Sequence, residues 1–305
     1  MIIRATFVLF FSCLFFSCDK GEGPRLDGKK EDFKIYRLSK ERMPYYKRIK
    51  PSLSFSPTDE QGVVMKPYNN TFYYDPVQLS RRTLELLNGY DYTNDKAYLD
   101  KAQLFASKLA EEAVRYKNSL FFPYNFDFLL HGDYRKTQKA PWYSGTAQGQ
   151  ALSTFTRLYN LTRKEKYLHL ADSTFNSFFV SKSTKHPWVV DIDNQGYVWI
   201  EEYPRKEMNQ TLSGPIFAIY GLYDYYLLKM DKSSENLLLQ AITTIKENVH
   251  LYRSKDKCSV YCLKHSVRNV KYHNIHIEQL EKLFDITHDD YFMTMSIAFR
   301  TDKCK

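Results

Sequence analysis

A short junction recurs three times in this 305-residue chain and limits what the chain can fold into. The segments LLNGYDYTNDKAYL (86–99), RLYNLTRKEKYL (157–168) and KLFDITHDDYF (282–292) each join an apolar helix end, a threonine, an acidic residue and a tyrosine. Apolar residues recur at spacings of three and four on both sides of each junction, as in amphipathic helices. One helical hairpin cannot bury its own apolar face, so repeated hairpins are expected to stack.

The same periodicity predicts eight helices, which make four hairpins. Thr162 with Glu165, and Thr287 with Asp290, have the spacing of a capping box at the start of the second helix. We therefore predict a mainly α fold, a partial (α/α) toroid of about four helical hairpins with a cleft at one end. The helices are expected at residues 78–89, 96–116, 145–161, 165–179, 212–228, 235–250, 274–285 and 290–299.

Three long connections, at residues 117–144, 180–211 and 251–273, contain most of the unusual polar and aromatic residues. Within the second, segment 186–203 alternates apolar and polar residues around an Asn-Gln-Gly turn, which predicts a small β-hairpin. If the helices close into a ring, these loops converge at one end. The β-hairpin is then expected at the cleft.

The first 33 residues have the composition of an export signal and a linker. An arginine and an apolar run precede Cys18, which is typical of a signal peptide (1–18) and too short for a comfortable membrane span. Ser17 before Cys18 favours a lipoprotein signal with lipidation of Cys18, over ordinary cleavage or an uncleaved anchor. Residues 19–33 are expected to form a tether, 34–75 an irregular N-terminal wrap, and 76–305 the toroid domain. We thus expect export across the inner membrane and lipid anchoring to a bacterial membrane, in the periplasm or at the cell surface.

The charge balance favours an anionic partner. The formal net charge is +9 and the pI is about 9.0, which suits a polyanion but also a generally basic surface. No zinc finger, RNP sequence or arginine-rich arm is present, so nucleic acid is not expected. The 25 tyrosines and 21 phenylalanines either fill a helical core or line a saccharide cleft. An acidic polysaccharide is the expected partner, and a homodimer stays open.

The cysteines and histidines give little support for a metal. Beyond the expected signal peptide the chain has three cysteines, Cys258, Cys262 and Cys304. Because this number is odd, a complete set of disulfides is not possible, and one bridge from Cys304 to Cys258 or Cys262 is the most that is expected. No CxxC pair indicates zinc. His273 and His276 have HxxH spacing but lack an evident third ligand, so helix-start histidines with ordinary partners are favoured. We predict neither a metal nor a cofactor.

The run WIEEYP (199–204) places two carboxylates beside a tyrosine. Side chains alternate in an extended chain, so if Tyr203 faces the cleft, Glu201 does too, and Glu202 turns away unless the backbone bends. A glycosidase would pair one of these acids with Asp191 or Asp193. The alternative is a pair of strand-end acids in solvent.

In SVYCLKH (259–265), Tyr261, Lys264 and His265 share a side if the segment is helical or tightly turned. A phenol, with a pKa near 10, acts as a base only where nearby cations favour phenolate, and Lys264 and His265 would supply that field. The alternative is a tyrosine packed in a wall with surface cations.

The stretch WYSGTAQGQALS (142–153) predicts a helix with Ser144 as N-cap. Gln148 and Gln150 near its start are able to hold sugar hydroxyls. The small residues around Gly149 more plainly allow close helix packing.

Taken in order, four motifs resemble the C-terminal catalytic domain of the D-glucuronyl C5-epimerases, the heparosan or heparan glucuronate 5-epimerase type. They are WYSGTAQGQALSTFTRLYNLT, WIEEYP followed by SGPIFAIYGLYDY, SVYCLKH and KYHNIHIEQL, which cover roughly residues 120–285. The resemblance implies an α/α toroid and an isomerase. Such an enzyme removes the C5 proton of D-glucuronate within a polysaccharide and returns it on the other face, giving L-iduronate.

The resemblance also implies site residues. Tyr203, Tyr261 and Tyr272 would be catalytic, with Tyr203 and Tyr272 as an opposed acid/base pair and Tyr261 assisting. The enediolate formed next to the substrate carboxylate needs nearby cations. The residues expected to bind substrate are Tyr143, Gln148, Glu201, Glu202, Ser213, Lys264, His265, Arg268 and His273.

The sequence departs from the family pattern at several of these positions. Lys264 stands for an arginine and keeps the charge without the two-pronged grip on a carboxylate, a loss for which Arg268 can compensate. Cys262 stands for an aspartate, Ser213 for an asparagine, and Val270-Lys271 for Trp-Asp. These changes leave a uronate polysaccharide lyase or a non-catalytic glycan-binding lipoprotein as alternatives, with a glycoside hydrolase less favoured.

Overall fold

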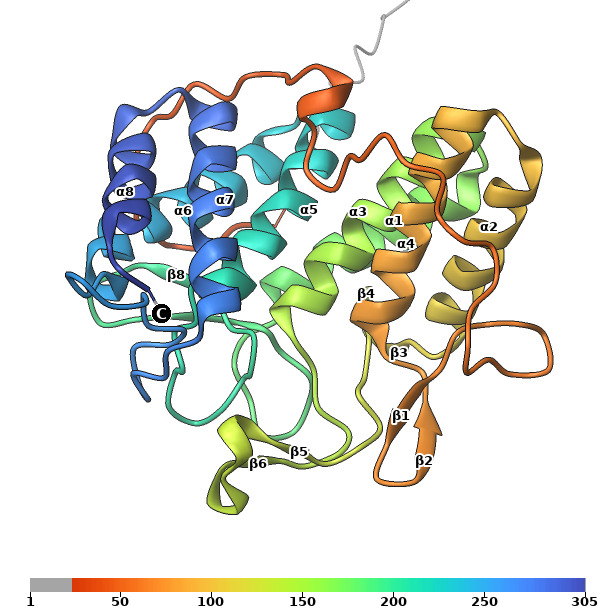
Figure 1. Cartoon of the computed structure of the whole chain (residues 1–305), viewed down its shortest axis with the longest axis horizontal. Coiled ribbons are helices and arrows are strands. Elements are labelled where there is room, and N and C mark those ends of the chain that lie inside the picture. The colour runs from red at the N-terminus through yellow and green to blue at the C-terminus, as the bar shows by residue number, and fades with distance from the viewer. Residues whose placement is uncertain (1–23, 305) are drawn as a thin grey trace, which may run out of the picture.

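The computed structural model describes residues 24–304, so the expected signal peptide and the expected lipidation site, Cys18, lie outside the described residues. Within this part the chain is mainly helical (Figure 1). The helices are α1 (Pro76–Thr93), α2 (Lys96–Glu111), α3 (Gly145–Thr162), α4 (Glu165–Asn176), α5 (Ser213–Lys229), α6 (Lys232–Asn248), α7 (Val270–Thr287) and α8 (Asp290–Thr301). All eight expected helices are confirmed. The second and fourth end earlier than expected, since β3 follows α2 and a 3-10 turn, Ser177–Phe179, follows α4.

The described strands form four separate antiparallel pairs. They are β1 (Lys66–Tyr68) with β2 (Thr71–Tyr73), β3 (Val114–Tyr116) with β4 (Ser119–Phe121), β5 (Phe128–Leu129) with β6 (Thr137–Gln138), and β7 (Val190–Ile192) with β8 (Val198–Ile200). The last pair is the β-hairpin expected in segment 186–203. Figure 1 shows these hairpins and the longer loops gathered at one end of the helices.

Consecutive helices form hairpins joined by two residues, but the capping-box prediction is wrong. Thr162 is the last residue of α3, and its hydroxyl donates to the carbonyl of Leu158. Thr287 ends α7 in the same way. The next residue is left-handed, as at His288 (φ 53°), and the following one is the N-cap. In α8 that cap is Asp289, whose carboxylate accepts from the Tyr291 N–H. The threonine thus closes one helix, and the residue two places later begins the other.

The odd-numbered helices lie side by side in chain order, and each is backed by its hairpin partner. The tightest approach is between α3 and α5, where a Cβ added at Gly221 would lie 2.0 Å from the Gly149 carbonyl oxygen. The expected role of the small residues around Gly149 is therefore confirmed. Helix α5 is buried on every side over most of its length, which places it at the centre of the partial toroid.

The N-terminal segment packs on the helices. Residues 24–33, the described part of the expected tether, lie along α6. The Glu31 N–H donates to the hydroxyl of Thr243, and the Gln240 amide donates to the Leu26 carbonyl. No helix among residues 24–304 has the length and hydropathy needed to cross a membrane.

One disulfide, Cys258–Cys304, joins the loop after α6 to the end of the chain after α8. Cys262 is a buried free thiol.

Candidate active site

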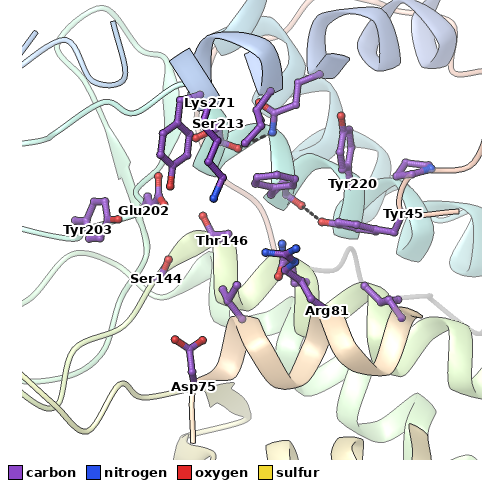
Figure 2. A pocket seen from close by; sticks show the side chains of 18 of the residues that line it. Tyr45, Asp75, Arg81, Ser144, Thr146, Glu202, Tyr203, Ser213, Tyr220 and Lys271 are labelled. Carbon is purple, nitrogen blue, oxygen red and sulfur yellow. Dashed lines mark hydrogen bonds between the residues drawn. The ribbon is translucent and has the colours of Figure 1, made fainter. Parts of the chain in front are cut away.

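A cavity of about 620 Å³ opens at the N-terminal ends of the odd-numbered helices (Figure 2). Asp75, the N-cap of α1, and Ser144, the N-cap of α3, both line it. So do Ser213, the first residue of α5, and Tyr272 in the first turn of α7. Helix N-termini carry free N–H groups and partial positive charge, so their convergence favours an anionic ligand.

The three tyrosines singled out in the sequence meet at this cavity. Tyr203 and Tyr272 line it. Tyr261 is buried between them, with its hydroxyl oxygen 3.3 Å from that of Tyr203 and its ring centroid 4.4 Å from that of Tyr272. Tyr203 and Tyr272 therefore line one cavity. That they act on opposite faces of a sugar stays a prediction.

Glu202 is the cavity carboxylate of this segment, not Glu201. The backbone bends directly after β8, so Glu202 and Tyr203 both line the cavity and lie beside each other in Figure 2. Burial raises the pKa of Glu202, and the hydroxyls of Tyr261, Thr211 and Tyr203 partly offset this. Among the described residues, however, its Oε2 has no hydrogen-bond partner of good geometry. This oxygen is an acceptor beside the cavity without a donor.

The tyrosines are neutral acids in this environment. Burial, and then the negative charge of Glu202, raise the pKa of Tyr203 and Tyr261 well above the usual value of 10.0. Tyr272 is raised less strongly, and Arg81 opposes the shift. Glu202 is thus the carboxylate next to these tyrosines, and Tyr272 is the tyrosine whose pKa is raised least.

Two cations at the cavity, Arg81 and Lys271, were not predicted from the sequence to be site residues. Arg81 and Lys271 form no ion pair among residues 24–304, whereas Lys66 pairs with Asp75 at 2.6 Å. Lys271 directly precedes the predicted catalytic Tyr272, and this position could have indicated that it is a site residue. No sequence pattern indicates Arg81, which lies on α1 and joins the cavity only in the folded protein. The charged lining residues are Lys47, Lys66, Arg81, Lys271 and Lys282 with Asp75, Glu85, Glu202 and Glu278.

An aromatic wall borders the cavity beside Tyr203. The rings of Tyr124 and Trp142 stack with centroids 3.8 Å apart, and Phe128 stacks on Tyr203 at 5.9 Å. The Trp142 indole N–H donates to the Phe126 carbonyl, which fixes the ring. Such flat apolar faces suit the C–H faces of a sugar. Trp142 was not among the residues expected from the sequence to bind substrate, whereas its neighbour Tyr143 was.

Several residues expected to bind substrate have structural roles. Tyr143 is absent from the cavity lining and packs edge-on against Phe121. Gln148 is fully buried, where it accepts from the Phe122 N–H and donates to the Leu120 carbonyl. Their predicted contacts with sugar hydroxyls are not supported by these positions. Ser213 and Gln150 do line the cavity.

The cations expected around Tyr261 lie elsewhere. Lys264 forms an ion pair with Glu207, and Arg268 donates to the hydroxyl of Ser254, both outside the cavity lining. Burial and nearby cations lower the pKa of His265, so it is neutral at pH 7. These positions do not support the expected cationic field that would turn Tyr261 into a base. The segment is a tight turn in which Cys262 and His265 meet, whereas Lys264 turns to Glu207.

The two histidines with HxxH spacing are buried next to one serine. The Ser259 N–H donates to Nδ1 of His273, and the Ser259 hydroxyl contacts Nδ1 of His276 at 2.8 Å. His273 does not line the cavity, so its expected substrate contact is not supported.

The glycosidase pairing is also unsupported. Asp191 forms an ion pair with Lys182, and Asp193 accepts from the Trp199 indole. Neither aspartate is part of the cavity lining.

Glu201 is a buried structural acid with a predictable effect on stability. Its carboxylate accepts from the N–H groups of Asn209 and Gln210, yet burial dominates and raises its pKa from 4.5 to about 7. A raised carboxyl pKa favours the protonated form in the folded state. Its contribution to the free energy of unfolding is therefore full below about pH 4.5 and is lost as the pH rises through about 7.

We expect Glu201→Gln to remove this pH dependence. The free energy of unfolding should be measured with denaturant at about pH 5 and about pH 8. Between these two pH values the parent should lose roughly 3 kcal/mol more than the variant, because a shift of about 2.5 pKa units corresponds to about 1.36 kcal/mol per unit. Equal losses in the two proteins would contradict the assignment.

Comparison with known proteins agrees with these features. A family model described as the D-glucuronyl C5-epimerase C-terminus matches residues 117–301. The D-glucuronyl C5-epimerase of Caenorhabditis elegans is 26% identical over 168 residues, which are 49% of this chain and 27% of that protein. A cellobiose 2-epimerase of Dictyoglomus turgidum is 34% identical over 95 residues, 30% of this chain and 23% of that one. The chain thus covers 27% and 23% of the lengths of these two relatives.

Solved structures share the fold. The cellobiose 2-epimerase from Bacillus thermoamylovorans has a TM-score of 0.51 and 12% identity, covering 74% of this chain and 58% of that one. The enzyme from Spirochaeta thermophila has a TM-score of 0.52 and 10% identity, with 74% and 57% covered. These likenesses confirm the α/α toroid architecture. Because the family model spans more than half of the residues, the chain belongs to the D-glucuronyl C5-epimerase C-terminus family.

Proposed function

We propose that this protein is a carbohydrate epimerase that inverts C5 of D-glucuronate residues within an anionic polysaccharide, giving L-iduronate. The observation that carries the proposal is the placing of Glu202 beside Tyr203 and Tyr272 on one cavity that also holds unpaired Arg81 and Lys271. Family membership and similarity to two carbohydrate epimerases support the reaction class.

The substrate carboxylate binds where positive charge gathers, at Arg81, Lys271 and the converging helix N-termini. Glu202 takes the C5 proton, and the electron pair of the broken C–H bond forms an enediolate on the uronate. Cations and neutral phenol donors stabilise that dianion, because they are already oriented toward the cavity before charge develops.

Tyr272 then delivers a proton to the opposite face of C5, which inverts the centre. Its phenolate recovers a proton from Glu202 through Tyr203 and Tyr261, whose hydroxyl oxygens are 3.3 Å apart, with the Tyr261 ring against Tyr272. The cycle consumes no proton and needs no oxidant. Roles for all three tyrosines are retained, with the base reassigned to Glu202.

The polymer, the anchor and the assembly are further parts of the proposal. The aromatic wall and the basic balance suit a glucuronate-containing capsule, exopolysaccharide or heparosan-like chain. Lipidation of Cys18 would hold the enzyme at a bacterial membrane in the periplasm or at the cell surface. The proposed function does not involve nucleic acid, and it is compatible with a homodimer.

Deuterium exchange tests the reaction. Full-length protein incubated in heavy water with a panel of glucuronate polymers is expected to place deuterium at C5, measured by nuclear magnetic resonance. Tyr272→Phe should slow the exchange by about 10²–10⁴-fold, because it removes the acid of the second step. Tyr92→Phe, at the opposite end of α1 from the cavity, is the matched control.

The results that would contradict the proposal are specific. Absence of exchange with every polymer, together with measurable glycan binding, would identify a binding protein. A product that absorbs in the ultraviolet would identify a lyase, which expels the C4 substituent after the same deprotonation. Parent-like exchange in both Tyr203→Phe and Tyr272→Phe would remove the tyrosines from the mechanism.

A further inference from the structure

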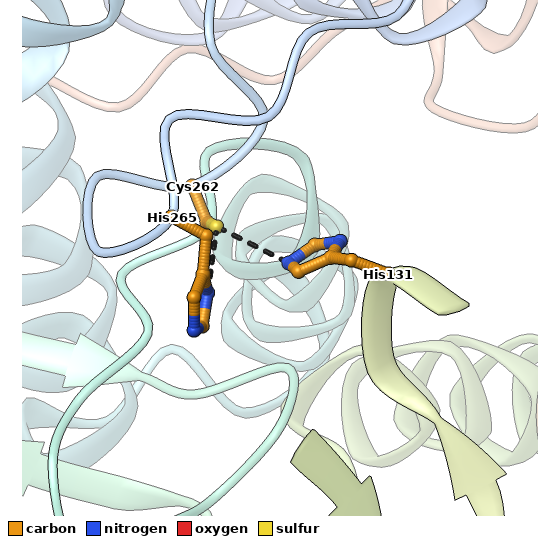
Figure 3. A group of neighbouring side chains, drawn as sticks. All are labelled: His131, Cys262 and His265. Atoms are coloured by element: carbon orange, nitrogen blue, oxygen red, sulfur yellow. Dashed lines mark hydrogen bonds between the residues drawn. The ribbon is translucent and has the colours of Figure 1, made fainter. Parts of the chain in front are cut away.

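Three side chains that could hold a metal ion meet outside the cavity lining (Figure 3), with the His131 ring next to Tyr261. Cys262 and His265 come from the loop before α7, and His131 comes from the 3-10 turn Leu130–Gly132. The Cys262 Sγ lies 3.5 Å from Nε2 of His131 and 3.4 Å from Nδ1 of His265. The three ligand atoms all lie within 4.8 Å of one another.

These spacings fit a tetrahedral zinc ion. Bonds of about 2.3 Å to sulfur and about 2.0–2.1 Å to nitrogen imply a sulfur-to-nitrogen edge of roughly 3.5 Å. Both observed sulfur-to-nitrogen distances have this value. The two histidines are only half-buried and lie on loops, so closing the nitrogen-to-nitrogen edge requires a small side-chain movement.

The surrounding charges are mainly basic and partly compensated. The nearest basic residues include Lys136 and Lys264, each of which is paired with a carboxylate: Lys136 with Asp133, and Lys264 with Glu207. Arg205 is also near and donates to the Lys136 carbonyl. Glu207 balances Lys264, whereas Asp133 is shared by Lys136 and Arg135. The Cys262 thiolate would offset part of the charge of a bound metal.

We propose that Cys262, His131 and His265 bind one zinc ion, with water at the fourth position. A soft thiolate with two imidazoles favours zinc over magnesium or calcium, which prefer oxygen ligands. No local motif such as CxxC marks this site, because Cys262 and His131 are 131 residues apart.

The ion would clasp two long loops behind the candidate active site. Cys262 forms a backbone bridge with Thr211 and follows Tyr261, while the His131 ring lies edge-on to the Tyr261 ring at 5.9 Å. Zinc at this point would fix Tyr261 from behind without entering the cavity. This positioning role is independent of which carbohydrate the cavity accepts.

Metal analysis of the full-length protein tests the site. After loading with zinc and dialysis, the parent should retain one zinc ion per chain by elemental analysis. Cobalt loading should give a thiolate-to-cobalt charge-transfer band. In His131→Gln and His265→Gln the zinc dissociation constant should rise by more than about 100-fold, since even changes to residues behind a metal ligand cost 10–100-fold. Exposed His169→Gln is the matched control.

Cys262→Ser should abolish the charge-transfer band. If this buried variant fails to fold, the two histidine variants and the melting temperature of the parent with and without zinc still decide the question. If the parent retains no zinc, or if His131→Gln retains as much zinc as the parent, the proposed site is wrong. The three side chains would then be joined only by S–H···N hydrogen bonds.

Discussion

Replacing Glu202 with glutamine is expected to lower C5 proton exchange by about 10³-fold or more while the protein stays folded, because the variant keeps the shape and loses the base. Glu202 is the cavity carboxylate next to Tyr203 and Tyr261, whose pKa values are raised by burial and by its charge. A neutral amide cannot accept the C5 proton. Exchange rates of parent and variant, measured on one polymer, give the effect.

The pH profile provides a second measure of the same role. Glu202 must be ionised to act, and burial raises its pKa above the ordinary 4.5. The kcat/KM of the parent should therefore fall, as the pH is lowered, at a higher pH than an ordinary glutamate would give. Glu235→Gln, on α6 away from the cavity, is the control. Exchange in Glu202→Gln at the parent rate would show that another group is the base.

Gly221→Ala is expected to lower the free energy of unfolding by about 3 kcal/mol, the upper part of the usual range for an overpacked core. A Cβ at this position would lie 2.0 Å from the carbonyl oxygen of Gly149, which is backbone and cannot rotate away. Helices α3 and α5 would have to separate at the centre of the fold. Because the odd-numbered helices carry the cavity at their ends, exchange activity should fall as well.

The sign of this effect makes it informative. Helix propensity alone predicts that alanine in place of an interior glycine stabilises a helix by about 1 kcal/mol. Chemical denaturation of Gly221→Ala and of the larger Gly221→Ser should show losses that grow with side-chain size. Stabilisation by alanine would mean that the two helices do not approach as closely as the structure shows.

Local pattern was enough to predict the helices and the β7–β8 hairpin, since each depends on residues a few positions apart. It failed where one backbone bend changes the direction of side chains. After β8 the chain leaves the extended form, so Glu202 faces the cavity and Glu201 is buried, the reverse of the alternation expected for a strand. Local pattern also failed at Lys264. This residue was expected to place positive charge beside Tyr261, but it forms an ion pair with Glu207 outside the cavity lining.

The sequence by itself determined the stacked helical hairpins, the small residues at the α3–α5 contact, and the tyrosines that meet at the cavity, because periodicity, residue size and motif order are properties of the chain. Only the tertiary structure decided which polar groups share a space. The charge of Arg81 acts on Tyr272 in the shared cavity, and His131 contacts Cys262, although each pair is far apart in the sequence. No local pattern encodes such meetings, because they depend on how whole helices and loops pack against each other.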